Sequence, residues 1–94
     1  MQIEIRIELS LVNARLPLAA LADVTLSYDS EHILIRRCAV FEKSGEPPWA
    51  SFPRLHIERN GTKSLVPLIE MSGGLKRRLL AAILVEYRTQ RDAH

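Results

Sequence analysis

Basic side chains are the groups of this 94-residue chain whose type and placement suggest a chemistry. Ten of its 13 basic residues are arginine, and a guanidinium group suits two-point binding of phosphate better than an ammonium group does. The formal net charge is only +2, so these residues indicate phosphate binding only if they cluster on one face. A solvated helix face would explain the C-terminal arginines equally well. The candidate nucleic-acid contacts are Arg54, Arg59, Lys63, Arg77, Arg78 and Arg88.

Catalytic and metal-binding patterns are missing from the sequence. No second histidine or cysteine lies at metal-ligand spacing from any of the three histidines, which are His32, His56 and His94. The single cysteine, Cys38, excludes an internal disulfide and a multi-cysteine metal site. Ser72-Gly73-Gly74 is followed by Leu75 and not by the lysine of a phosphate loop. We therefore expect no enzymatic activity, no cofactor, no metal and no small-molecule substrate.

Two aromatic residues, Trp49 and Phe52, flank a short run that follows the polar loop of residues 42–48. Aromatic side chains on strands can stack on unpaired bases. The chain has only two Phe, two Tyr and one Trp, however, and a hydrophobic core needs most of them. We therefore expect Trp49 and Phe52 to be core residues rather than base-stacking residues.

The elements that must position these groups follow from the period of the apolar residues. Residues 2–9 alternate strictly between polar and apolar side chains, which predicts a half-buried strand. Asn60-Gly61 between two short runs predicts a hairpin, because a type I′ turn needs positive φ at both central residues. Turn-forming residues predict further connections at 13–17 and 29–31. The predicted strands are residues 2–9, 18–28, 32–41, 49–52, 55–59 and 62–66.

The C-terminal segment is predicted to be a helix that begins near Gly73, with Ser72 as its N-cap. Its apolar face covers about half of the circumference, whereas a helix on one sheet needs a stripe of roughly 100°. Either a twisted sheet wraps around this face or a second subunit covers its far edge. Because so small a domain gains from a partner, we expect a homodimer whose interface includes Leu80, Leu84 and Tyr87.

Length and element order together predict the fold class. A chain of 94 residues suits one domain, residues 1–94. We expect an α+β fold in which an antiparallel sheet of five to six strands is followed by one C-terminal helix. The longest apolar run, Leu79 to Val85, is too short to span a membrane, and the N-terminus has no signal-peptide pattern. We therefore expect a cytoplasmic protein with no membrane partner.

Several stretches resemble the SpoVG family, the bacterial stage V sporulation G or septation proteins. The resemblance covers roughly residues 3 to 90 and is carried by the order and spacing of the elements. Where the family usually has Ser-Lys-Arg, this chain has Arg54-Leu55-His56. The stretches that carry the resemblance are residues 18–26, Ile33-Leu34-Ile35-Arg36, Trp49-Ala50-Ser51-Phe52-Pro53, Leu65-Val66-Pro67-Leu68-Ile69 and residues 81–87.

The resemblance implies a function. Members of the family are small, usually dimeric cytoplasmic regulators that are linked to septation and sporulation and implicated in binding DNA and RNA. It thus implies a cytosolic, dimeric, nucleic-acid-binding regulator with an SpoVG-like fold. The alternative is a protein–protein interaction module that binds no nucleic acid, in which a sheet edge or the wide helix face contacts the partner and the arginines keep the surface soluble.

Overall fold

The computed structural model describes residues 2–12 and 17–93. Its elements follow the predicted order, and most of the predicted turn at 13–17 lies outside the described residues. The only helix of the described part, α1, is not long and apolar enough to cross a membrane. The elements are β1 (Glu4–Leu11), β2 (Leu18–Tyr28), β3 (Glu31–Phe41), β4 (Trp49–Ser51), β5 (Arg54–Arg59), β6 (Thr62–Pro67) and α1 (Gly73–Asp92).

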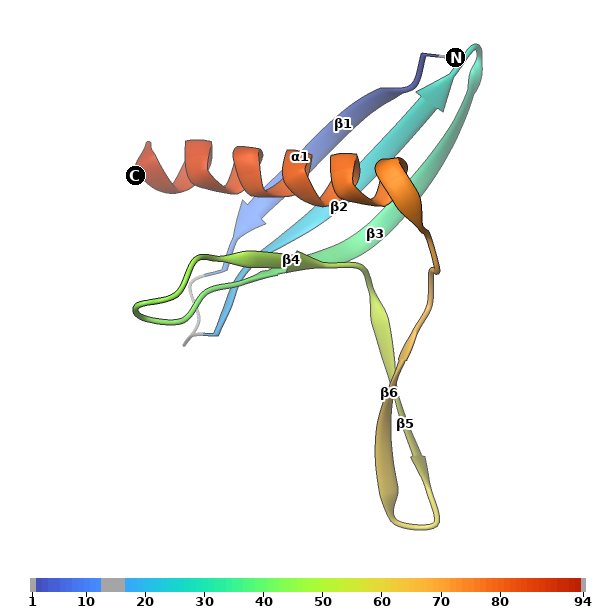
Figure 1. Ribbon diagram of the computed structural model, residues 1–94, viewed down its shortest axis with the longest axis vertical. Coiled ribbons are helices and arrows are strands. Elements are labelled where there is room, and N and C mark those ends of the chain that lie inside the picture. The colour runs from blue at the N-terminus through green and yellow to red at the C-terminus, as the bar shows by residue number, and fades with distance from the viewer. Residues whose placement is uncertain (1, 13–16, 94) are drawn as a thin grey trace.

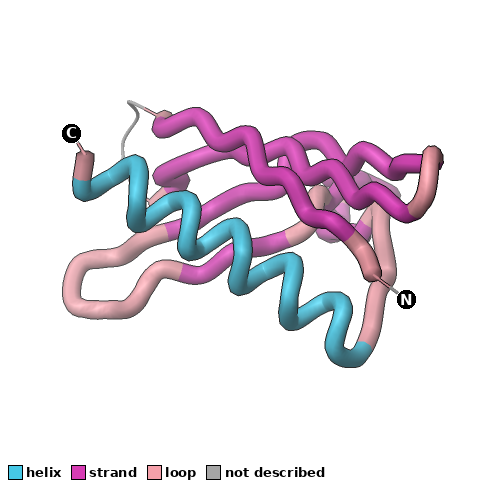
Figure 2. Tube along the Cα trace, turned by 90° about the horizontal axis from the view of Figure 1, so that it is seen from above, coloured by secondary structure: helices cyan, strands magenta, loops and turns pink. Residues whose placement is uncertain are grey.

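Strands β1 to β4 form an antiparallel sheet in the order β1-β2-β3-β4, and α1 lies across one face of it (Figures 1 and 2). Alternation along the strands sends apolar side chains to the helix side and leaves polar ones on the other face, as is usual for an antiparallel sheet. The core cluster consists of Leu9, Ala19, Ala20, Ala22, Val24, Leu26, Ile35, Cys38, Val40, Leu79, Ile83 and Tyr87. The α+β class is therefore confirmed.

The expectation of one sheet with five to six strands is wrong, because β5 and β6 form a separate two-stranded sheet. Pro53 lies two residues after Ser51, the last residue of β4, and has no N–H to continue the ladder, so the chain leaves the main sheet there. The N–H of Leu68 donates to the carbonyl oxygen of Pro53 at 3.1 Å and closes the base of the pair. Figure 1 shows this hairpin projecting away from the sheet and the helix.

The hairpin turns at Asn60 and Gly61, whose φ values of 51° and 78° are both positive. This confirms the predicted turn, which pairs Arg59 with Thr62 across its ends. In the described part of the chain, no other strand or helix packs against β5 or β6. The hairpin is therefore an arm held by its own ladder and by its base.

A β-bulge in β3 changes how two neighbouring arginines, Arg36 and Arg37, are placed on the strand. Both arginines stand opposite the single residue Asp23, because Val24 pairs with Ile35 and Ala22 with Cys38. The backbone N–H of Arg37 donates to Asp23 Oδ1 at 3.1 Å, and Arg36 Nη1 lies 3.6 Å from Asp23 Oδ2. The extra residue keeps both guanidinium groups exposed and returns Cys38 to the core.

The helix begins at Gly73 as predicted, but the Ser72 side chain makes no capping hydrogen bond. The placement of Tyr87 at a dimer interface is also wrong, because Tyr87 is only 3% exposed within its own chain. Its hydroxyl donates to Glu42 Oε2 at 2.6 Å, and Arg91 Nη1 donates to Glu42 Oε1 at 2.8 Å. The sheet and the residue after β3 thus cover this edge of the helix.

Leu80 and Leu84, the other two predicted interface residues, are half-buried and pack against the same core cluster. They lie on the flank of α1 and keep part of their surface exposed. The wide apolar face of α1 is therefore largely covered by its own sheet, which was the alternative to a second subunit.

Candidate nucleic-acid interface

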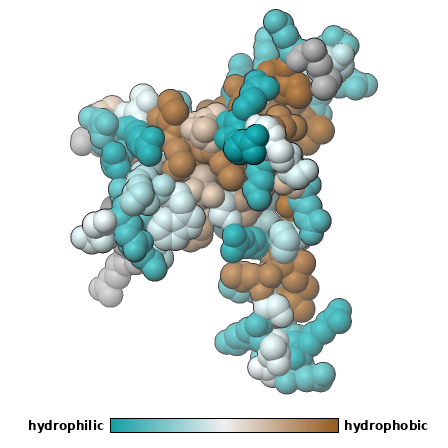
Figure 3. Space-filling view, in the orientation of Figure 1, coloured by the Kyte–Doolittle hydropathy of each residue, from teal (hydrophilic) through white to brown (hydrophobic). Residues whose placement is uncertain are grey.

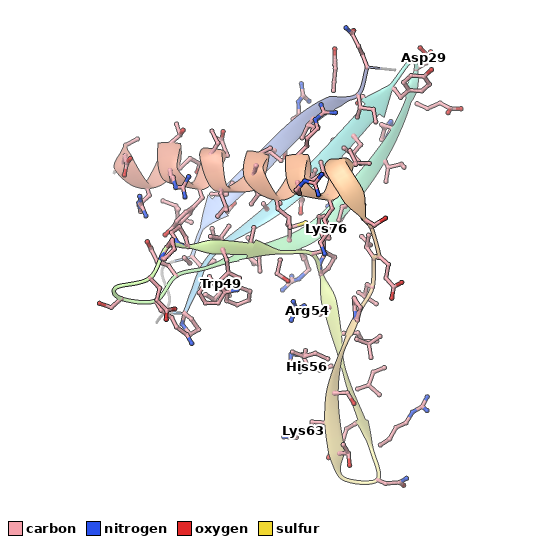
Figure 4. The ribbon with its side chains drawn as sticks, viewed as in Figure 1. Asp29, Trp49, Arg54, His56, Lys63 and Lys76 are labelled. Atoms are coloured by element: carbon pink, nitrogen blue, oxygen red, sulfur yellow. The ribbon has the colours of Figure 1, made fainter. Side chains whose placement is uncertain are left out.

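The hairpin register brings three basic or imidazole side chains to one face. Arg54 and His56 are two apart on β5, and His56 stands opposite Leu65, which is two residues from Lys63 on β6. Because side chains alternate along a strand and opposite residues share a face, all three point the same way. Figure 4 shows Arg54, His56 and Lys63 following one another down one side of the hairpin.

Lys76 extends this line onto the helix. It belongs to the first turn of α1, and Figure 4 shows its side chain directed toward the corner where β4 meets the hairpin. Lys76 and Arg54 line the same cleft of about 220 Å³ beside β4, together with Trp49 and Leu80. We call the set Arg54, His56, Lys63 and Lys76 the cationic face.

The cationic face keeps its charge available. None of the ion pairs formed within residues 2–12 and 17–93 involves Arg54, Lys63 or Lys76. All four side chains of this face are exposed. One carboxylate shares it, since Glu58 stands opposite Lys63 in the register. The face can therefore attract phosphate groups, which interact favourably with unpaired cations.

Trp49 is not the core residue that the sequence suggested, because 40% of its surface is exposed. It stands opposite Phe41 and stacks on it with ring centroids 5.5 Å apart, while Lys43 Nζ lies 5.9 Å from the indole centroid. Figure 4 shows Trp49 below β4, at the end of this strand that lies away from the hairpin. Phe52 is half-buried against the core, as expected.

The structure brings only two of the six predicted contact residues together, Arg54 and Lys63. Arg59 lies on the opposite face of the hairpin, because it is an odd number of residues from Arg54 along β5. The three helix arginines, Arg77, Arg78 and Arg88, are exposed on α1, whose buried side carries Leu79 and Ile83. The predicted set therefore divides into three separate groups.

Two members of the cationic face, His56 and Lys76, were absent from the predicted contact set. The signal for His56 was available, because counting alternate residues outward from the Asn60-Gly61 turn places it beside Arg54 and Lys63. Nothing local to the sequence identifies Lys76, because its approach to Arg54 depends on how α1 crosses the end of β4. Neither does any local pattern indicate the exposure of Trp49.

The perturbed titratable groups lie away from the cationic face. Burial, followed by the charge of Asp23, raises the pKa of the Cys38 thiol to about 11. Burial, followed by the hydrogen bond with Glu42, raises the pKa of the Tyr87 phenol. Both groups belong to the core between sheet and helix. Within the described residues, no three His, Cys, Asp or Glu side chains gather closely enough to hold a metal ion.

Comparison of the chain with protein-family models, with curated proteins and with solved structures found no match. The arrangement of the described side chains therefore carries the functional argument.

Proposed function

We propose that this protein binds nucleic acid through its backbone phosphates along the cationic face. The observation that carries this proposal is the alignment of Arg54, His56 and Lys63 on one side of a projecting hairpin, in line with Lys76. Arg54, Lys63 and Lys76 form no ion pair within the described chain. Contacts of this kind give affinity and orientation with little base readout. The resemblance to the SpoVG family supports a regulatory role of the same kind.

We further propose that the chain acts as a homodimer in which the second copy covers the other face of the hairpin. That face carries Leu55, Ile57 and Val66, and Leu55 and Val66 are 48% and 39% exposed. Figure 3 shows apolar residues in the half of the hairpin nearer the main body, whereas the tip is hydrophilic. An isolated two-stranded ribbon is marginally stable, so a second copy on its apolar face would stabilise it. Such a dimer leaves the opposite cationic face open in both copies.

Salt dependence tests the phosphate proposal. Binding of a fluorescein-labelled oligonucleotide is followed by anisotropy between about 50 and 200 mM salt. Each phosphate that is neutralised adds about 0.7 to the log–log slope on a single strand and about 0.9 on duplex DNA. Three permanent cations per copy, Arg54, Lys63 and Lys76, give a slope of about −2 per copy on a single strand. An affinity that does not change with salt would refute phosphate binding.

The interaction-module alternative is favoured by the same apolar hairpin face, and a pull-down separates it from nucleic-acid binding. Material captured by the protein is treated with nuclease before elution. We expect co-purified nucleic acid to disappear and other proteins to be lost with it. Capture of a defined protein that survives nuclease, together with no binding of oligonucleotides, would support the alternative and contradict our proposal.

A further inference from the structure

The position of Trp49 determines which form of nucleic acid fits the cationic face. β4 is only three residues long, and Trp49 is its first residue, opposite Phe41. Large aromatic side chains gain most from burial, yet 40% of the surface of this one is exposed. Phe41 holds the indole in place by stacking at an interplanar angle of 25°. The structure thus presents a fixed, exposed aromatic ring outside the core.

The residue Trp49 lines a cleft together with cations. Trp49, Arg54 and Lys76 line one hollow of about 220 Å³, and Phe52 and Leu80 add apolar surface to it. Lys43 adds a further cation over the indole ring, with its Nζ 5.9 Å from the ring centroid. A planar aromatic surface flanked by cations matches one nucleotide, whose base stacks while its phosphate is held.

Base pairing decides access to this ring. In a duplex the bases are stacked on each other and present only their edges in the grooves, so a duplex offers phosphates to Arg54 and Lys63 but no base face to Trp49. A single strand offers both. We infer that the ligand is single-stranded nucleic acid, with an unpaired base stacked on Trp49 and the flanking phosphates held by Arg54 and Lys76. This inference rests on the proposed function and specifies its ligand.

Trp49 is the single tryptophan of the chain, so its fluorescence reports directly on the cleft. The probes are a thymidine oligonucleotide of about 12 nucleotides, a duplex of the same length and inorganic polyphosphate. We expect the oligonucleotide to quench Trp49 and to bind about tenfold more tightly than the duplex, which is the loss expected for one base stack. Polyphosphate should bind in a salt-dependent manner without a stacking contribution.

Substitution separates stacking from charge. We expect Trp49→Leu, which keeps an apolar side chain, to weaken oligonucleotide binding about tenfold and to leave polyphosphate binding within about twofold. Trp49→Phe should restore most of the loss, because a ring is present again. Tyr28→Leu is the matched control, since Tyr28 is also an exposed aromatic residue, 46% exposed, at the far end of β2. Circular dichroism and thermal melting establish that each variant is folded.

The outcomes of this experiment are distinct. Equal affinity for the oligonucleotide and the duplex, with Trp49→Leu unchanged, would overturn the single-strand inference and leave phosphate binding intact. Failure of all three probes to bind would overturn the proposed function itself. Equal losses in Trp49→Leu and Tyr28→Leu would show that aromatic surface at this position has no special role, which also contradicts the inference.

Discussion

At the scale of single residues, the parity of positions along β5 and β6 determines which cations act together. Arg54 and Arg59 carry the same group on the same strand, but they point to opposite faces of the hairpin. Arg54 also lines the cleft with Trp49 and Lys76, whereas Arg59 adjoins the turn. The sequence alone therefore does not tell which of these two arginines belongs to the cationic face. Their positions in the structure distinguish them.

This pair gives a matched test of the cationic face. On a single strand, Arg54→Gln should reduce the steepness of the log–log salt slope by about 0.7 and weaken binding of all oligonucleotide sequences to the same extent. Arg59→Gln removes the same charge from the same strand. It should leave the salt slope and the oligonucleotide affinity unchanged within experimental error. Anisotropy titrations at several salt concentrations measure both. Equal effects of the two substitutions would show that net charge, rather than the face, controls binding.

Tyr87 and Glu42 give a second residue-scale prediction, concerning stability. Burial and the hydrogen bond with Glu42 raise the pKa of Tyr87 above its ordinary value of 10.0. The folded state therefore holds this proton more tightly than the unfolded state does. The stabilisation is fully present below about pH 10 and is lost as the pH rises through the higher pKa of the folded state.

Tyr87→Phe removes this titration together with the 2.6 Å hydrogen bond. We expect it to lower the free energy of unfolding by about 1.5 kcal/mol at neutral pH. Above about pH 10 the variant should lose less stability than the wild-type chain. Urea unfolding at about pH 8 and about pH 11 compares the two proteins. A parallel decline in both would contradict the role assigned to this hydroxyl.

At the scale of elements, the hairpin differs from every other described strand pair, because no other element packs on it. Local stability follows the number of buried apolar contacts. We expect amides of β5 and β6 to exchange with solvent much faster than those of β2 and β3 in the unliganded protein when it is dilute enough to be monomeric, and to become protected when an oligonucleotide binds. Hydrogen-exchange mass spectrometry measures this directly. Equal protection of all strands in dilute, unliganded protein would contradict an independent arm.

Most element boundaries could be predicted from sequence because their causes are local. Asn60-Gly61 predicted the hairpin turn, with positive φ at both residues. Strict alternation predicted a strand at residues 2–9, and the observed β1 lies two residues later, at Glu4–Leu11. The division of the six strands into two sheets could not be predicted. Alternation indicates which residues of a strand share a face, but it does not indicate which strands pair. The bulge at Arg36 and Arg37 was missed for the same reason, because it depends on the register against Asp23.

The candidate site could be predicted only in part. The importance of the segment containing Arg54 and Lys63 followed from charge and from the turn. Lys76 and Trp49 joined the site through the crossing of α1 over the end of β4, which no local pattern encodes. Tyr87 was misplaced because the twist of the sheet, rather than the width of the apolar stripe, decides how much of a helix is covered.

At the scale of the whole molecule, the two faces of the hairpin divide the surface into two functions. One face carries the cations together with Leu65, and the other carries Leu55 and Val66. We expect Leu55→Ser combined with Val66→Ser to convert a dimer into a monomer, because the apolar surface that the second copy covers is lost. Light scattering after size exclusion measures the mass. The matched control is Ile33→Ser, since Ile33 is 63% exposed on β3, far from the hairpin.

The dimer prediction also affects binding. Two copies present two cationic faces, so the log–log salt slope on a long single strand should approach about −4, and the monomeric variant should return it to about −2. A wild-type chain that is monomeric at all concentrations would contradict the dimer and leave the cationic face of one copy to be tested alone.

The most direct test of the central claim is an NMR titration of the isotope-labelled 10.7 kDa protein with a thymidine oligonucleotide. The side-chain resonances of Arg54, Trp49 and Lys76 should shift together in a saturable manner, with an affinity that falls as salt is added. Those of Arg59 and Arg88 should remain in place. Shifts confined to the helix arginines, or no shifts at all, would contradict binding at the cationic face.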